Sequence, residues 1–91
     1  MNPNNFEREL STVKSLLQEA YSEAGGPGDV DMNAPILSLG IDSIGLVGLN
    51  GDLKATFGRG ISIEQVVNGA TGNDVAEFLR REIIAADNEP A

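Results

Sequence analysis

The sequence contains neither cysteine nor histidine. Without cysteine, the chain can form no disulfide and no thiolate metal site. Without histidine, it lacks the commonest general base and a frequent metal ligand. These two absences argue against an enzyme that uses its own side chains. If the chain handles thioesters, their sulfur must come from a cofactor.

Basic residues are also scarce, since 6 Lys and Arg stand against 14 Asp and Glu and give a formal net charge of −8. Such a chain is repelled by the negative charges of nucleic acids and anionic membranes. Its partners should therefore be proteins with basic or apolar surfaces. Residues 1–5 lack the apolar core of a signal peptide, and no apolar run approaches membrane-spanning length. We predict a soluble, cytoplasmic monomer with no nucleic acid or membrane partner.

The length of 91 residues is enough for one domain and too short for two. A domain of this size buries only about 60–65% of the surface of its unfolded chain, so we expect a thin core. We predict a single domain over residues 1–91, with its core at about 6–84 and a polar, frayed tail at about 86–91. The initial Met1 and the polar ends suggest a freestanding chain, although an excised domain would look the same.

Apolar residues recur at three- and four-residue spacing in three segments, as in amphipathic helices. The first predicted helix covers about 5–23 and is stopped by the Gly-Gly-Pro-Gly run at 25–28. The second starts at Ser43 and runs to residue 57. The third opens near residue 71. Their apolar stripes comprise Phe6, Leu10, Val13 and Leu17, then Leu46, Leu49, Leu53 and Phe57, and finally Val75, Phe78, Leu79 and Ile83.

The connections between these helices carry their own signals. Segment 61–67 could be a strand or one to two helical turns by its composition. Thr71, with Asp74 three residues on, resembles a capping box. The long connection at 25–41 is rich in loop-forming residues but also in apolar ones, so we predict that it packs against the helices. Those apolar residues are Val30, Met32, Ile36, Leu37 and Leu39.

Ser43 stands in the run Leu39-Gly40-Ile41-Asp42-Ser43-Ile44, where the long connection meets the second helix. Free backbone N–H groups and the positive end of the helix dipole favour an anion at such a position, for example a phosphate ester. An isolated Asp-Ser pair there is usually only a helix cap. Gly40 suits a turn with positive φ or a close approach by a partner.

This run resembles the attachment motif of acyl and peptidyl carrier proteins, L-G-x-D-S-[LI], and the helix order matches that family over about residues 6–84. The resemblance implies an all-α fold: a small four-helix carrier-protein bundle with three main helices, one short helix within 61–67 and a long first loop. It also implies that a phosphopantetheinyl transferase moves a 4′-phosphopantetheine arm from coenzyme A onto Ser43. Asp42 matches the supporting Asp of the motif.

The same resemblance implies a non-catalytic carrier with no metal site. Its arm would hold acyl intermediates as thioesters and present them to acyl-loading and chain-processing synthase enzymes. Ile44 and Val47 lie one and four positions after Ser43 and share a helix face beside the arm. In carrier proteins the corresponding positions contact partner enzymes. Core packing is the alternative for both residues.

Three glycines, Gly45, Gly48 and Gly51, lie within the second predicted helix and lower its helix propensity by roughly 3 kcal/mol relative to alanine. In fatty-acid-synthase carriers, the positions matching Gly45 and Gly48 are typically acidic. Segment 43–60 holds one acidic and two basic residues, whereas the rest of the chain is strongly acidic. We therefore predict partner docking through close, largely apolar contact at residues 44, 45, 47 and 48. This pattern favours a carrier of specialised metabolism, either polyketide or nonribosomal peptide, over a fatty-acid carrier. Glycines that are merely tolerated on an exposed face are the alternative.

Other functions explain less of the sequence. A peptidyl carrier of nonribosomal peptide synthesis is the nearest alternative, but the acidic pI of about 4.2 and the length slightly favour an acyl carrier. A cofactor-free helical interaction domain would make the placement of Asp42-Ser43 a coincidence. Segment 29–33 copies the first ligands of an EF-hand loop, yet Ala34 and Gly40 stand where Gly and Glu are required. A hydrolase based on Ser43 would lack a base.

Overall fold

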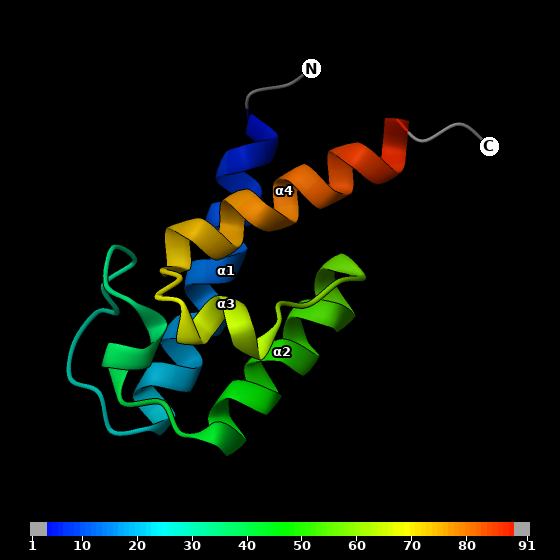
Figure 1. The fold of residues 1–91 in the computed structure, drawn as a ribbon. Coiled ribbons are helices and arrows are strands. Elements are labelled where there is room, and N and C mark those ends of the chain that lie inside the picture. The colour runs from blue at the N-terminus through cyan, green and yellow to red at the C-terminus, as the bar shows by residue number, and fades with distance from the viewer. Residues whose placement is uncertain (1–3, 89–91) are drawn as a thin grey trace.

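The computed structural model describes the backbone of residues 4–88 and the side chains of residues 7–83. Within this range the chain forms four α-helices: α1 (Asn4–Glu23), α2 (Ser43–Phe57), α3 (Ile63–Val67) and α4 (Gly72–Asn88). A short 3₁₀ helix, η1 (Ile36–Leu39), interrupts the loop between α1 and α2 (Figure 1). The predicted all-α bundle of three long helices, one short helix and a long first loop is confirmed.

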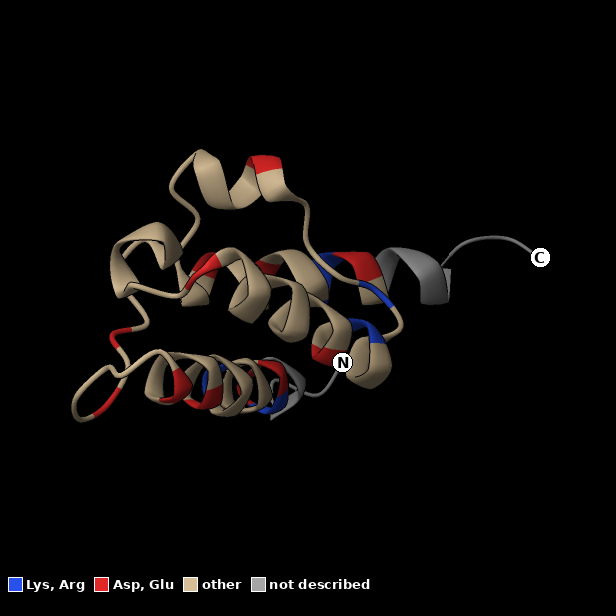
Figure 2. Ribbon diagram, turned by 90° about the horizontal axis from the view of Figure 1, so that it is seen from below, with Lys and Arg blue, Asp and Glu red and all other residues tan. Residues whose placement is uncertain are grey.

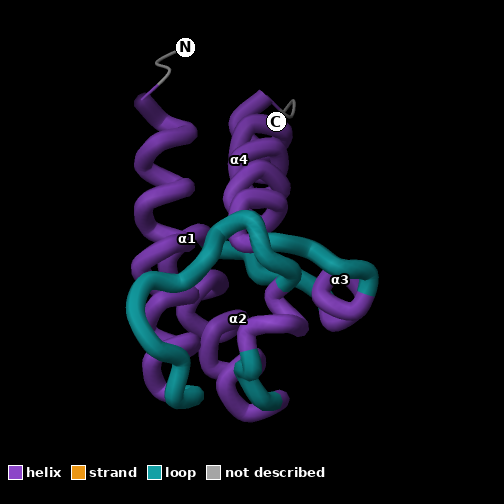
Figure 3. Tube along the Cα trace, turned by 90° about the vertical axis from the view of Figure 1, so that its left-hand side faces the viewer, coloured by secondary structure: helices purple, strands orange, loops and turns teal. Residues whose placement is uncertain are grey.

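Helix α1 packs against both α2 and α4, whereas α3 contacts η1. Figure 3 shows α1 and α4 side by side, with loop segments passing close to the lower end of α4. Four elements each contribute a fully buried side chain to one core: Leu17 from α1, Ile36 from η1, Leu53 from α2 and Leu79 from α4. The core therefore depends on contacts between residues far apart in the sequence.

The long first loop packs against the helices, as its apolar residues predicted. Val30 and Ile36 are buried, and the backbone N–H of Ile36 donates a hydrogen bond to the Ala70 carbonyl at 2.9 Å. The prediction is wrong for Leu37, whose side chain is 53% exposed. In the tight turn of a 3₁₀ helix, neighbouring side chains point in different directions, so burying Ile36 leaves Leu37 outside.

Segment 61–67 is helical over Ile63–Val67, as the family resemblance implied. A capping box starts α3: the Ser62 hydroxyl accepts the Gln65 N–H at 3.2 Å, and the Gln65 side chain accepts the Ser62 N–H at 2.8 Å. This Ser-x-x-Gln pattern is a sequence signal for a helix start, and it settles the choice between strand and helix without reference to any family.

The predicted start of the last helix is confirmed, while its end differs from the prediction. The Asp74 carboxylate accepts the Thr71 N–H at 3.0 Å, and the Thr71 hydroxyl accepts the Asp74 N–H at 3.1 Å. Helix α4 runs to Asn88, so residues 86–88 of the predicted frayed tail are helical. The remaining residues of that tail, 89–91, and the side chain of Phe6 lie outside the described residues.

An ion pair between α1 and α4 was not predicted. The carboxylate of Glu9 lies 4.0 Å from the guanidinium of Arg80, and both side chains are largely buried. The two residues are 71 positions apart in the sequence, so no local pattern could pair them. If α1 shifted along α4, each of these two charges would be buried without its partner, at a substantial cost in desolvation free energy. The ion pair therefore favours one alignment of α1 on α4.

The three glycines of α2 have different surroundings. A Cβ atom at Gly48 or Gly51 would have no other group within 4 Å. A Cβ atom at Gly45 would lie 2.7 Å from Cγ2 of Ile41 and 3.2 Å from Oδ1 of Asp42. Glycine is therefore needed for packing at position 45, whereas at positions 48 and 51 the fold gains nothing from it.

We expect Gly48→Ala and Gly51→Ala each to raise the free energy of unfolding by about 0.5–1 kcal/mol, because alanine favours the helix and enters open space. Gly45→Ala should lower that free energy, since Ile41 and Asp42 would have to move. Urea unfolding followed by circular dichroism measures all three variants. Equal stabilisation at all three positions would contradict the packing role of Gly45.

Candidate functional site

Ser43 is the first residue of α2, and its side chain is exposed. The N-cap is Asp42, whose Oδ1 accepts the Gly45 N–H at 2.7 Å, while its carbonyl accepts the Leu46 N–H at 2.9 Å. Among the described residues, no hydrogen bond involves the Ser43 hydroxyl. Capping therefore belongs to Asp42, and the alternative in which Ser43 serves as the cap is wrong.

The residues before Ser43 hold it in place. Gly40 has φ 79° and ψ 10°, a left-handed conformation that confirms the predicted positive-φ turn at the end of η1. Ile41 follows with only 7% of its side chain exposed and anchors the segment in the core. The turn at Gly40, the buried side chain of Ile41 and the cap formed by Asp42 thus follow one another directly. Together they present Ser43 at a fixed point on the surface.

The site offers an accessible hydroxyl without a base to activate it. The carboxylate of Asp42 is the nearest ionisable group in sequence and is engaged with the Gly45 amide. The chain has no histidine. Within the described part of the chain, no group of three or more acidic side chains is arranged to hold a metal ion. The site thus presents an exposed hydroxyl whose neighbouring carboxylate already serves as the helix cap.

The predicted docking residues lie around Ser43 on α2. Ile44 and Val47 are 81% and 69% exposed, so the core-packing alternative is wrong for both. Gly48 is exposed, whereas Gly45 is half-buried against Ile41 and Asp42. The structure thus brings an exposed apolar pair and one open glycine together beside Ser43. Whether partners bind there stays a prediction.

Two grooves flank α2. The α1/α2 groove has a volume of about 420 Å³ and an apolar floor that includes Leu16 and Leu49. Four acidic residues line it: Glu19, Glu23, Asp42 and Asp52. The α2/α3 groove has a volume of about 460 Å³ and mostly apolar walls. The sequence analysis did not identify either groove, because each is formed by segments that are not adjacent in the chain.

The acidic wall corrects one inference from the sequence. Segment 43–60 carries no net negative charge by itself, which suggested a docking region without acidic character. In the fold, Glu19 and Glu23 of α1 lie beside the first turns of α2 and line the same groove as Ile44 and Gly48. Figure 2 shows acidic positions along α1. One side of the docking region is therefore acidic, and two of its four carboxylates come from the neighbouring helix α1.

A comparison with protein-family models matches residues 11–79 of the chain to the phosphopantetheine attachment site family. The chain belongs to this family. Searches of curated proteins and of solved structures gave no match. The matched range covers η1, α2 and α3 and most of the core, and it includes the Leu39–Ile44 run.

Members of this family carry 4′-phosphopantetheine covalently, and its domains are carriers that typically perform no catalysis themselves. They work with a modifying transferase and with synthase enzymes. The arm supplies a thiol that can form thioesters, and this cysteine-free chain has no thiol of its own. An exposed Ser43 hydroxyl, free of hydrogen bonds in the described structure and lying at a helix N-terminus, fits such an attachment.

Among the described residues, no helix is both long enough and apolar enough to span a membrane.

Separate roles for Asp42 and Ser43 predict separate effects on stability. Asp42→Ala should lower the free energy of unfolding by about 0.5–2 kcal/mol, because the Gly45 N–H loses its acceptor. Asp42→Asn keeps an acceptor and should preserve most of the stability. Ser43→Ala should change it by less than about 0.5 kcal/mol. Chemical denaturation of the three variants tests this assignment, and a Ser43→Ala loss as large as that of Asp42→Ala would refute it.

Proposed function

We propose that this chain is an acyl carrier protein that holds acyl intermediates as thioesters on a 4′-phosphopantetheine arm at Ser43. It presents them to acyl-loading and chain-processing enzymes, in a pathway of the polyketide type. The observation that carries this proposal is the exposure of Ser43 at the first position of α2, directly after the capping residue Asp42. We further propose that residues 1–91 act as one monomeric carrier domain in the cytoplasm.

In the attachment step, the Ser43 oxygen attacks the phosphorus that bears the pantetheine end of coenzyme A. A phosphoester bond to Ser43 forms and the pyrophosphate bond breaks. Adenosine 3′,5′-bisphosphate leaves, and the hydroxyl proton passes to a base of the transferase. The chain itself supplies the nucleophile and its position. Asp42 supports the step indirectly, because its hydrogen bond to Gly45 maintains the first turn of α2.

The partner-docking surface in this proposal consists of Ile44, Gly45, Val47 and Gly48. Ile44 and Val47 offer exposed apolar side chains one and four residues after the attachment site. Gly48 lets a partner approach the backbone of α2, since its surroundings are open. Gly45 contributes by preserving the geometry of the cap. Close apolar contact, rather than an acidic side chain at positions 45 and 48, then supports a polyketide-type partner over a fatty-acid-type one.

Incubation with coenzyme A, Mg²⁺ and a broad-specificity phosphopantetheinyl transferase should add the mass of one phosphopantetheine to the intact protein. Ser43→Ala should prevent the gain completely. Ser62→Ala is the matched control, because Ser62 is also exposed and lies at the start of a helix. This control should gain the same mass as the parent chain. A folded protein that gains no mass, or a gain that survives Ser43→Ala, would rule out the proposed attachment.

Gly48→Glu should lower kcat/KM of the same transferase reaction by about tenfold, because desolvating a carboxylate in an apolar contact costs about 1 kcal/mol or more. Ser15→Glu places the same charge on an exposed position of α1 and should leave kcat/KM within about twofold. Gly48→Ala adds a side chain without a charge, so its kcat/KM shows how much of the Gly48→Glu effect comes from side-chain volume alone. If Gly48→Glu reacts like the parent chain, the close-contact surface is wrong.

A further inference from the structure

The α2/α3 groove combines a buried apolar floor with exposed apolar walls. Its floor includes Ile61 and Val66, both buried, and Leu46, which is partly buried. Leu37, Val47, Ile63 and Val67 form walls that are largely exposed to solvent. All four are large hydrophobic residues that are more than half exposed, so the bundle leaves much of their apolar surface open to solvent. They surround a volume of about 460 Å³, which suits an apolar ligand of small size.

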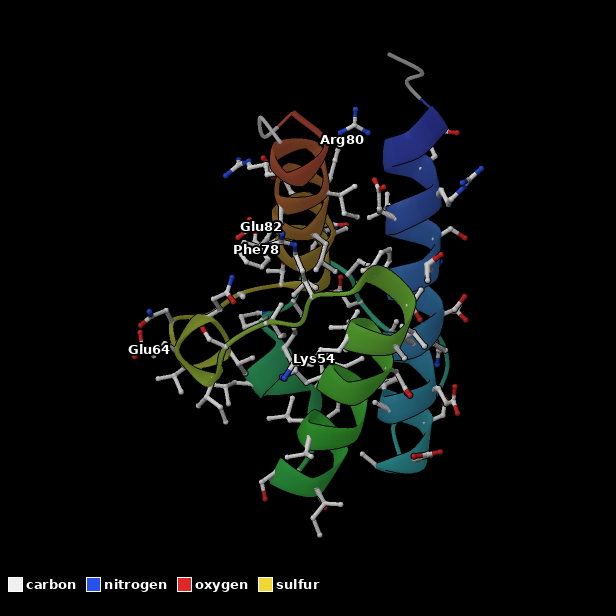
Figure 4. The ribbon with its side chains drawn as sticks, turned by 90° about the vertical axis from the view of Figure 1, so that its right-hand side faces the viewer. Lys54, Glu64, Phe78, Arg80 and Glu82 are labelled. Carbon is white, nitrogen blue, oxygen red and sulfur yellow. The ribbon has the colours of Figure 1, made fainter. Side chains whose placement is uncertain are left out.

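The groove contains one positive charge and no negative charge in its described lining. Lys54 is the only charged residue among those that line it. Figure 4 shows the Lys54 side chain extending from α2 toward α3 and η1, while Glu64, the only acidic residue of α3, points away from the bundle. Among the described residues, no carboxylate forms a salt bridge with Lys54. Lys54 is an exposed residue, so an anion in the groove would gain a modest attraction to its ammonium group that salt can screen.

The groove follows the helix face that begins at Ser43. Val47, Gly51 and Lys54 lie 4, 8 and 11 residues after Ser43, spacings that place all four positions on one side of a helix. All three later residues line the groove. From Ser43 to Lys54 the distance along the α2 axis is about 16 Å. A flexible group attached at Ser43 can therefore fold back along this face and place its far end near Lys54.

We propose that the α2/α3 groove holds an acyl chain with an apolar body and a distal carboxylate, and that Lys54 pairs with this carboxylate. The inference rests on the proposed carrier function at Ser43. The apolar walls exclude water from the chain, and the ammonium of Lys54 selects for a negative charge at its far end. In a protein of net charge −8, an unpaired cation in an apolar groove gives an anionic cargo its one favourable local contact there.

Lys54 also lies in the last turn of α2, where a cation stabilises the helix dipole. That contribution is the same for every cargo. The test therefore compares two cargoes of equal chain length on the same protein. Octanoyl and octanedioyl groups differ only in the terminal carboxylate. Both can be loaded from their coenzyme A thioesters by the phosphopantetheinyl transferase, and intact mass establishes that loading is complete.

The melting temperature of each loaded protein is then measured at low ionic strength. We expect the octanedioyl form to melt about 2–5 °C higher than the octanoyl form, as a single charge pair in a partly exposed site allows. Lys54→Met should abolish this difference. Lys54→Arg should retain it, and so should Lys14→Met on the exposed surface of α1. Added salt should reduce the difference, because screening weakens the pair.

Each outcome separates the cargo inference from the carrier function. Loss of the cargo difference in Lys54→Met alone supports the pairing. Three results overturn it: equal melting temperatures of the two loaded forms of the parent chain, a difference that persists in Lys54→Met, or a difference that is lost equally in Lys14→Met. The groove would then remain available to a partner protein. These results all require that Ser43 is loaded. If the transferase adds no mass to the folded protein, the proposed function fails before the cargo is compared.

Discussion

The hydrogen bond from the Gly45 N–H to the Asp42 carboxylate fixes the start of α2, and the position of Ser43 follows from it. Ile41 is anchored in the core directly before this cap, and a side chain at position 45 would collide with both Ile41 and Asp42. The site thus depends on three neighbouring features: the buried side chain of Ile41, the cap formed by Asp42, and the lack of a side chain at Gly45. This arrangement frees the Ser43 hydroxyl from any structural task in the described bundle.

The brevity of α3 shapes the surface next to this site. Five residues can bury only a narrow apolar face, so Val66 enters the core while Ile63 and Val67 remain exposed. Helix α3 contacts η1 rather than covering α2, which leaves the α2/α3 groove between them. A segment with few buried contacts opens at low free-energy cost, so the α3 wall of this groove can move more easily than the wall formed by the longer helix α2.

Helix α2 separates two surfaces of opposite electrostatic character. Toward α1, four carboxylates line its groove, and toward α3, Lys54 is the only charged residue in the described lining. The exposed apolar residues Ile44 and Val47 lie between them near Ser43. The α1 side of α2 therefore carries negative charge, whereas the described lining on the α3 side carries a single positive charge.

Local sequence patterns were enough to predict the helix formed by residues 4–23, the start of α2 at Ser43, the Thr71–Asp74 capping box and the positive φ of Gly40. These depend on residues within one or two turns, so their patterns are legible in the chain. The exposure of Leu37, the pairing of Glu9 with Arg80, and the position of Glu19 and Glu23 beside α2 became evident only in the folded chain. Those features join distant segments, and burial and charge there depend on how the helices pack against one another.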